Sequence, residues 1–108
     1  MKNLTLSDYK AILYYYNVEV DTLSKKQIKL QAEDMLAAKL CRCIKKVNAI
    51  QKDNSRSIAI CRNRVIKRKG LATSGFKCKR KPRLLPFKKT KRVLKKLRKN
   101  LTIRKYKK

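Results

Sequence analysis

The pattern of apolar and polar positions predicts a short helix near the start of this 108-residue chain. Thr5 or Ser7 can cap its first turn, and Asp8 carries a negative charge where the helix dipole favours one. Asn17 is suited to end the helix because asparagine tolerates a positive φ angle. The apolar residues that recur three and four positions apart along this helix are Leu6, Tyr9, Leu13 and Tyr16.

A second and longer helix is predicted from Ser24, after a short extended loop at residues 18–23. Glycine and proline are absent before Gly70, so we place the end of this helix at residues 48–54, where Asp, Asn and Ser cluster. Residues 1–54 are therefore expected to form a helix–loop–long helix head. The apolar stripe of the second helix consists of Ile28, Ala32, Met35, Leu36, Leu40, Cys43, Ile44 and Val47.

The segment that follows the head fits more than one kind of secondary structure. Residues 57–61 have the composition of a buried strand and also fit the apolar face of a helix, and periodicity does not decide between them. Gly70 and Gly75 bracket a turn, and residues 76–80 alternate apolar and basic side chains as a short strand does. We expect a mainly α fold class with a small β or helical element around residues 57–79.

Residues 55–78 are expected to pack on the head as a small cysteine-containing segment, and residues 79–108 to form an extended polybasic tail. In this tail, 16 of 30 positions are Lys or Arg, a density at which a free chain repels itself. Pro82 and Pro86 interrupt any regular element at its start. A narrow apolar stripe that fits a conditional amphipathic helix is formed by Val93, Leu94, Leu97 and Leu101.

The charge of the chain narrows the classes of function. The net charge is +27, with 33 basic residues, six acidic residues and no histidine. Mechanisms that need imidazole are absent, and six carboxylates are poor material for paired-carboxylate catalysis, so we expect no enzyme activity. Residues 1–54 carry a net +4, whereas residues 55–108 carry +23 and no acidic residue. A charge of this size predicts a polyanionic partner.

Residues 6–13, with the start Leu-Ser-Asp-Tyr-Lys, are followed by Asn17-Val18 in the loop and by Ser-Lys-Lys-Gln-Ile at residues 24–28. Over residues 4–36 this arrangement resembles a SAP-type module, a helix–extended loop–helix unit associated with DNA binding. The chain departs from the family where Asn17 replaces the loop glycine and where the glycine before the lysines is missing. The alternative is that the two helices simply pack on each other and on the rest of the fold. The resemblance implies that the second helix presents its N-terminal lysines to phosphates, here Lys25, Lys26 and Lys29.

Residues 39–47, 58–61 and 75–79 are short basic segments that contain cysteine. Through these segments, the whole chain resembles small basic proteins encoded by nucleocytoplasmic large DNA viruses. This resemblance implies a virion or viral-factory protein near the genome or the capsid interior, located in the virion, the host nucleus or a cytoplasmic viral factory. The N-terminus lacks the apolar region of a secretory signal, so we expect an intracellular protein that is not secreted.

The four cysteines have the spacing C-x-C-x17-C-x16-C. A structural zinc site at Cys41, Cys43, Cys61 and Cys78 is the only zinc site available without histidine. Zinc ligand pairs are usually two to four residues apart, whereas C-x-C on a helix separates the sulfurs by about 200°. We therefore expect no metal or other cofactor, and reduced cysteines of which Cys43, Cys61 and Cys78 act as small buried apolar residues. The alternative is a disulfide formed by oxidation in a mature virion.

The tail is expected to supply most of the affinity for a polyanion. Residues 79–83 have the character of a nuclear-localisation signal. Lysine outnumbers arginine 23 to 10 over the chain, which favours phosphate contacts over reading of base edges. If about 8 phosphates are engaged, the log–log salt slope is about −7. The tail residues expected to bind nucleic acid are Lys79, Arg80, Lys81, Arg83, Lys88, Lys89, Lys91, Arg92, Lys95, Lys96, Arg98 and Lys99.

The sequence thus predicts a non-enzymatic, largely sequence-independent DNA-binding or DNA-condensing protein. One alternative is a minor capsid or scaffold protein whose basic tail contacts acidic protein surfaces or other virion proteins. Another is a ribosomal-type RNA-binding protein, because basic extensions with glycine turns also suit RNA grooves. The chain has no apolar run of 18 residues, so a transmembrane segment is not expected. Binding to a membrane surface is the weakest alternative because residues 93–101 have no Trp or Phe anchor.

Overall fold

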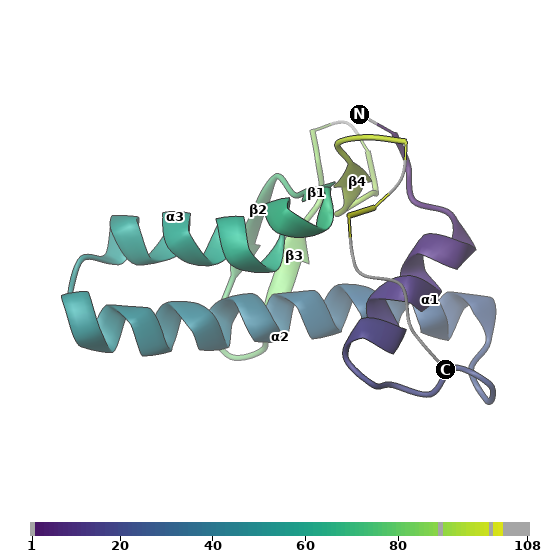
Figure 1. Ribbon diagram of the computed structural model, residues 1–108, viewed down its shortest axis with the longest axis horizontal. Helices are drawn as coiled ribbons and strands as arrows, with labels where there is room; N and C mark the ends of the chain where they lie inside the picture. The colour runs from purple at the N-terminus through teal and green to yellow at the C-terminus, as the bar shows by residue number, and fades with distance from the viewer. Residues whose placement is uncertain (1, 89, 100, 103–108) are drawn as a thin grey trace.

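A computed structural model describes residues 2–88, 90–99 and 101–102 of the chain. The fold is built on three helices, α1 (Leu6–Tyr15), α2 (Lys25–Gln51) and α3 (Asn54–Val65). Helix α2 forms the long axis, α1 packs against its N-terminal half, and α3 runs back along its C-terminal half (Figure 1). The predicted mainly α fold with a helix–loop–long helix start is confirmed.

The first two helices begin where the sequence places their caps. The Thr5 hydroxyl accepts a hydrogen bond from the Asp8 N–H at 3.3 Å, and the Asp8 carboxylate accepts one from the Thr5 N–H at 2.8 Å. Ser24 and Gln27 form the same reciprocal box at the start of α2. Asn17 adopts the predicted left-handed conformation, with φ of 61°. These caps satisfy backbone N–H groups that a helix start otherwise leaves without partners.

The segment around residues 57–61 is helical. Asp53 caps α3 by accepting a hydrogen bond from the Arg56 N–H. Ser57, Cys61 and Val65 lie four residues apart and are all buried on the side of α3 that packs against α2. Packing against a long neighbouring helix therefore selects the helical period over the strand period at these positions.

In the described part of residues 66–102, four short strands follow and form two antiparallel pairs. Strands β2 and β3 make a hairpin in which Phe76 is opposite Leu84, and β1 pairs with β4 so that Leu71 is opposite Lys96. Gly70, at φ of 80°, turns the chain from the short 3-10 helix into β1. The bounds of these elements are η1 (Lys67–Lys69), β1 (Leu71–Ala72), β2 (Gly75–Lys77), β3 (Arg83–Leu85) and β4 (Lys95–Lys96).

The described part of the predicted tail belongs to the fold. Leu84 and Leu94 are buried in the same core as the apolar residues of α1 and α2, and Leu94 is completely covered. Strand β4 occupies the middle of the stripe at residues 93–101, in place of the conditional helix that its spacing fits. The Lys2 N–H also donates to the Lys96 carbonyl, which ties this segment to the start of the chain. Residues 89, 100 and 103–108 of the tail lie outside the described residues.

The expectation of reduced cysteines is wrong, because all four are joined in two disulfides. Cys41 on α2 is bonded to Cys78 after β2, and Cys43 on α2 is bonded to Cys61 on α3. The Cα atoms are 5.7 Å apart in both pairs. The helical C-x-C spacing that argued against a shared zinc site turns the two sulfurs to different sides of α2, and each side meets another cysteine.

Candidate nucleic-acid interface

The lysines at the start of α2 differ in how far they reach into solvent. Lys25 and Lys26 are exposed in the first turn, beside the Ser24 cap. Lys29 is partly buried and close to Glu33. Burial raises the pKa of Glu33, and the positive charge of Lys29 acts in the opposite direction. Two of the three predicted phosphate contacts are therefore directed outward, and the third also interacts with a carboxylate of its own helix.

A second group of cations lies in the turn between β2 and β3. Lys79, Arg80 and Lys81 are exposed in this turn, and Arg83 is exposed at the start of β3. The turn passes behind the middle of α2 and emerges beyond it (Figure 1), where the Cys41–Cys78 disulfide fixes its base to the helix. These side chains are thus carried on a cross-linked hairpin.

The third group follows β3 and surrounds β4. Arg92 and Lys95 are partly buried, and the Lys95 ammonium lies 5.0 Å from the centre of the Phe87 ring, within range of a cation–π contact. Lys89 lies outside the described residues. The exposed members of this group are Lys88, Lys91, Arg98 and Lys99.

Lys96 is buried and holds two parts of the fold together. Its ammonium lies 2.8 Å from the Asp8 carboxylate, and the two side chains are only 9% and 16% exposed. Burial acts to raise the pKa of Asp8, but hydrogen bonds from Lys96 and Thr5 outweigh it and hold the pKa below its ordinary value. Lys96 therefore stabilises the contact between β4 and α1 and is little exposed to an external phosphate.

Lys69 is a second buried lysine that the sequence analysis did not single out. Its ammonium donates to the Val65 carbonyl at 2.9 Å and lies over the rings of Tyr15 and Tyr16, 4.8 and 5.3 Å from their centres. Burial lowers the pKa of Lys69 to about 8, and burial together with the Tyr15 charge raises the pKa of Tyr16 to about 12. The Lys69 ammonium points into the fold and lies beside the C-terminal end of α3, where the helix dipole favours a positive charge.

A hollow of about 340 Å³ between α2 and α3 brings together cations that the sequence analysis also missed. The signal available in the sequence is the spacing of Lys39, Arg42 and Lys46, which places three cations on one helical face. The contribution of Arg64 depends on the packing of α3 against α2, which no local pattern reveals. The residues that line this basic hollow are Lys39, Arg42, Cys43, Lys46, Val47 and Arg64.

The described ranges contain no group of three or more His, Cys, Asp or Glu side chains placed to hold a metal ion. The four cysteines are consumed by disulfides, so the zinc ligand set Cys41, Cys43, Cys61 and Cys78 has no thiolate to offer in this state. Among the described residues, no helix has both the length and the apolar character needed to cross a bilayer.

The chain was compared with protein-family models, curated proteins and solved structures, and none of them matches it.

Proposed function

We propose that the protein binds DNA without catalysing a reaction, mainly through contacts to phosphates that are independent of base sequence. The observation that carries this proposal is the scarcity of internal acidic partners for its cations. Within the described residues, a single ion pair forms, between Lys96 and Asp8. Because 33 basic residues face only six acidic ones, the chain keeps a net charge of +27 that an external polyanion can neutralise.

The arrangement of the exposed cations supports a backbone contact more than a reading of bases. The exposed cations that the sequence analysis singled out occupy three places in the fold, at the start of α2, in the β2–β3 turn and around β4, and most of them are lysines. Lysine acts as a point charge on phosphate, whereas base recognition relies on the planar forks of Arg, Asn and Gln. The SAP-type resemblance assigns the first of these places to DNA phosphates.

Titrations of fluorescent duplex DNA, single-stranded DNA and structured RNA at several salt concentrations test this function. We expect tightest binding to duplex DNA, with a log–log salt slope of about −7 for about 8 neutralised phosphates. Truncation after residue 78 is unsuitable because it removes Leu84 and Leu94 from the core. A better variant replaces the exposed group Lys88, Lys91, Arg98 and Lys99 by glutamine, which should flatten the slope by about 4.

Two results would contradict the proposal. Affinity that does not change with salt rules out phosphate neutralisation as its source. Tighter binding to structured RNA than to DNA supports the ribosomal-type alternative in place of this one.

The two disulfides favour a second candidate function, a structural protein of a virion. Disulfides persist in oxidising surroundings, which include released particles, and are rare in the cytosol. In this function the protein lies between the genome and acidic capsid surfaces. Crosslinking of purified particles tests it, since contacts to capsid proteins alone support a scaffold role and contacts to DNA support the primary proposal.

A further inference from the structure

We infer that the basic hollow between α2 and α3 is a preformed site for phosphate groups of a nucleic-acid backbone. This inference rests on the proposed function and adds a specific site to it. None of the residues that line the hollow belongs to the lysines at the start of α2, to the hairpin turn or to the segment around β4.

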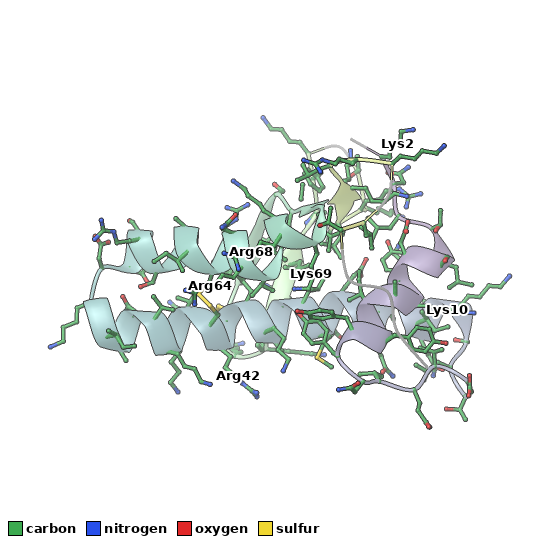
Figure 2. The ribbon with its side chains drawn as sticks, viewed as in Figure 1. Lys2, Lys10, Arg42, Arg64, Arg68 and Lys69 are labelled. Atoms are coloured by element: carbon green, nitrogen blue, oxygen red, sulfur yellow. A yellow bond between two sulfur atoms is a disulfide. The ribbon has the colours of Figure 1, made fainter. Side chains whose placement is uncertain are left out.

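The walls of the hollow come from two helices. Lys39, Arg42 and Lys46 lie three and four residues apart on α2, so their side chains leave the same face. Arg64 reaches the same space from the last turn of α3. Figure 2 labels Arg42 on α2 and Arg64 on α3 and shows that the two helices run side by side at this point.

The electrostatics of the hollow favour an anion. Four cations line it, and none of the six carboxylates of the chain does. Its other two lining residues, Cys43 and Val47, are uncharged and partly buried, so no group on the walls opposes the attraction of the four cations for an anion. A volume of about 340 Å³, roughly ten water molecules in the liquid, accommodates a phosphate group with some of its hydration.

The two walls are also held at a fixed separation. The Cys43–Cys61 disulfide joins α2 to α3, and Cys43 itself lines the hollow. Four residues before Cys43, the Lys39 ammonium lies 5.4 Å from the centre of the Tyr16 ring, a cation–π contact that restrains its position. Binding to such a site costs little backbone reorganisation, because the disulfide joins the two helices before the ligand arrives.

Phosphate is favoured over carboxylate as the ligand by charge density and by the arginine content. Two of the four cations are arginines, whereas arginines make up 10 of the 33 basic residues of the chain. The guanidinium fork pairs with two phosphate oxygens at once. Duplex DNA also carries one charge per roughly 1.7 Å of its axis, so neighbouring phosphates can engage the hollow and the surrounding cations together.

The test compares two triple variants that lose the same charge. The site variant is R42Q/K46Q/R64Q, and the control variant is K45Q/R56Q/K77Q, which replaces three exposed cations that do not line the hollow. We expect the site variant to lose about 100-fold in affinity for duplex DNA near 0.1 M salt and to flatten the salt slope by about 3. The control variant should lose less than about 5-fold, because its cations act only at long range.

Binding of tripolyphosphate, followed by amide chemical shifts in NMR spectra, tests the site without nucleic acid. Shifts centred on residues 39–47 and on Arg64, present in the unchanged protein and absent from the site variant, support the inference. Thermal unfolding of both variants shows whether they are folded. If the site variant is unfolded, the map of chemical-shift changes in the unchanged protein still shows whether tripolyphosphate binds in the hollow.

The outcomes separate this inference from the proposed function. If both triple variants lose DNA affinity equally, the hollow is not the site, while DNA binding itself stands. If the unchanged protein binds no nucleic acid, the proposed function fails, and the tripolyphosphate shifts alone support or overturn the hollow as a phosphate site. Stronger competition by polyglutamate than by tripolyphosphate would overturn the inference in favour of an acidic protein partner.

Discussion

The two halves of the described chain are stabilised in different ways. Residues 2–53 contain α1, α2 and all six acidic residues, and they are ordered by reciprocal helix caps and a continuous apolar stripe. Residues 54–102 contain α3 and four strands of two or three residues, with no acidic residue at all. Short strands of this kind have little stability of their own. The second half therefore depends on attachments to the first.

Each kind of attachment in the structure crosses between the halves. Both disulfides start from α2 and end in the second half. The Lys96–Asp8 ion pair joins β4 to α1. Leu84 and Leu94 complete a core that is otherwise formed largely by the helices. A segment that carries only positive charge cannot pair ionically with itself, and so it is folded by cross-links and apolar contacts to a more ordinary partner segment.

Removal of the disulfides should have the largest effect on this dependence. The Cys41–Cys78 link closes a separation of 37 residues and the Cys43–Cys61 link one of 18. Loop-closure entropy predicts losses in the free energy of unfolding of about 4 and about 3 kcal/mol for the C41A/C78A and C43A/C61A variants. Urea unfolding of the oxidised protein and of both variants measures these losses. A loss below about 1 kcal/mol in each variant would show that the second half is held mainly by other contacts.

Truncation of Leu94 should have an effect comparable with the loss of one disulfide. This side chain is completely buried in the shared core, so Leu94→Ala should lower the free energy of unfolding by about 2–5 kcal/mol. Leu97 is 47% exposed and provides a matched control, for which we expect a change within about 0.5 kcal/mol. Thermal and urea unfolding compare the two. Equal effects would mean that residues 93–97 are a tail outside the cooperative core.

The ion pair between the halves should give the smallest of the three effects, and it should depend on pH. Asp8→Asn leaves the buried Lys96 ammonium without its carboxylate, which we expect to cost about 1.5–3 kcal/mol near pH 7. The pKa of Asp8 is lower in the folded protein than its ordinary value. Its stabilisation is therefore present above the ordinary aspartate pKa and is lost as the pH falls through the folded pKa.

Urea unfolding between pH 2 and pH 7 measures this dependence. The unchanged protein should lose more stability on acidification than Asp8→Asn does, because the variant has no carboxylate to protonate at this position. The exposed Asp34 provides a control for the loss of one carboxylate, since Asp34→Asn leaves the Lys96–Asp8 ion pair in place. If the free energy of unfolding depends on pH in the same way in the Asp8 variant and the unchanged protein, the ion pair does not stabilise the attachment of the second half to the first.

The helices of the first half could be predicted because their signals are local. The cap residues Thr5 and Ser24, the stop at Asn17 and the apolar spacing all lie within a few residues of the structure that they specify. The strands could be predicted only in part. Residues 76–80 alternate as a strand does, but the pairing of Leu71 with Lys96 spans 25 positions and depends on the tertiary fold.

The candidate site also has features that local sequence predicts and features that depend on the tertiary fold. The density of lysine and arginine is visible in the sequence, and most of the predicted contacts are indeed exposed. The burial of Lys96 was missed because its partner Asp8 lies at the other end of the chain. The hollow was missed because Arg64 joins the cations of α2 only after α3 packs. The disulfides could not be predicted because Cys78 and Cys61 meet Cys41 and Cys43 only after β2 and α3 pack against α2.

That C-x-C pair has a consequence for oxidative folding. Four cysteines allow three pairings in an unfolded chain. Once α2 has formed, Cys41 and Cys43 are turned about 200° apart and cannot bond to each other. Docking of α3 then brings Cys61 to Cys43, which leaves Cys78 for Cys41. The helix thus excludes one of the three covalent patterns, and the packing of α3 against α2 selects between the other two.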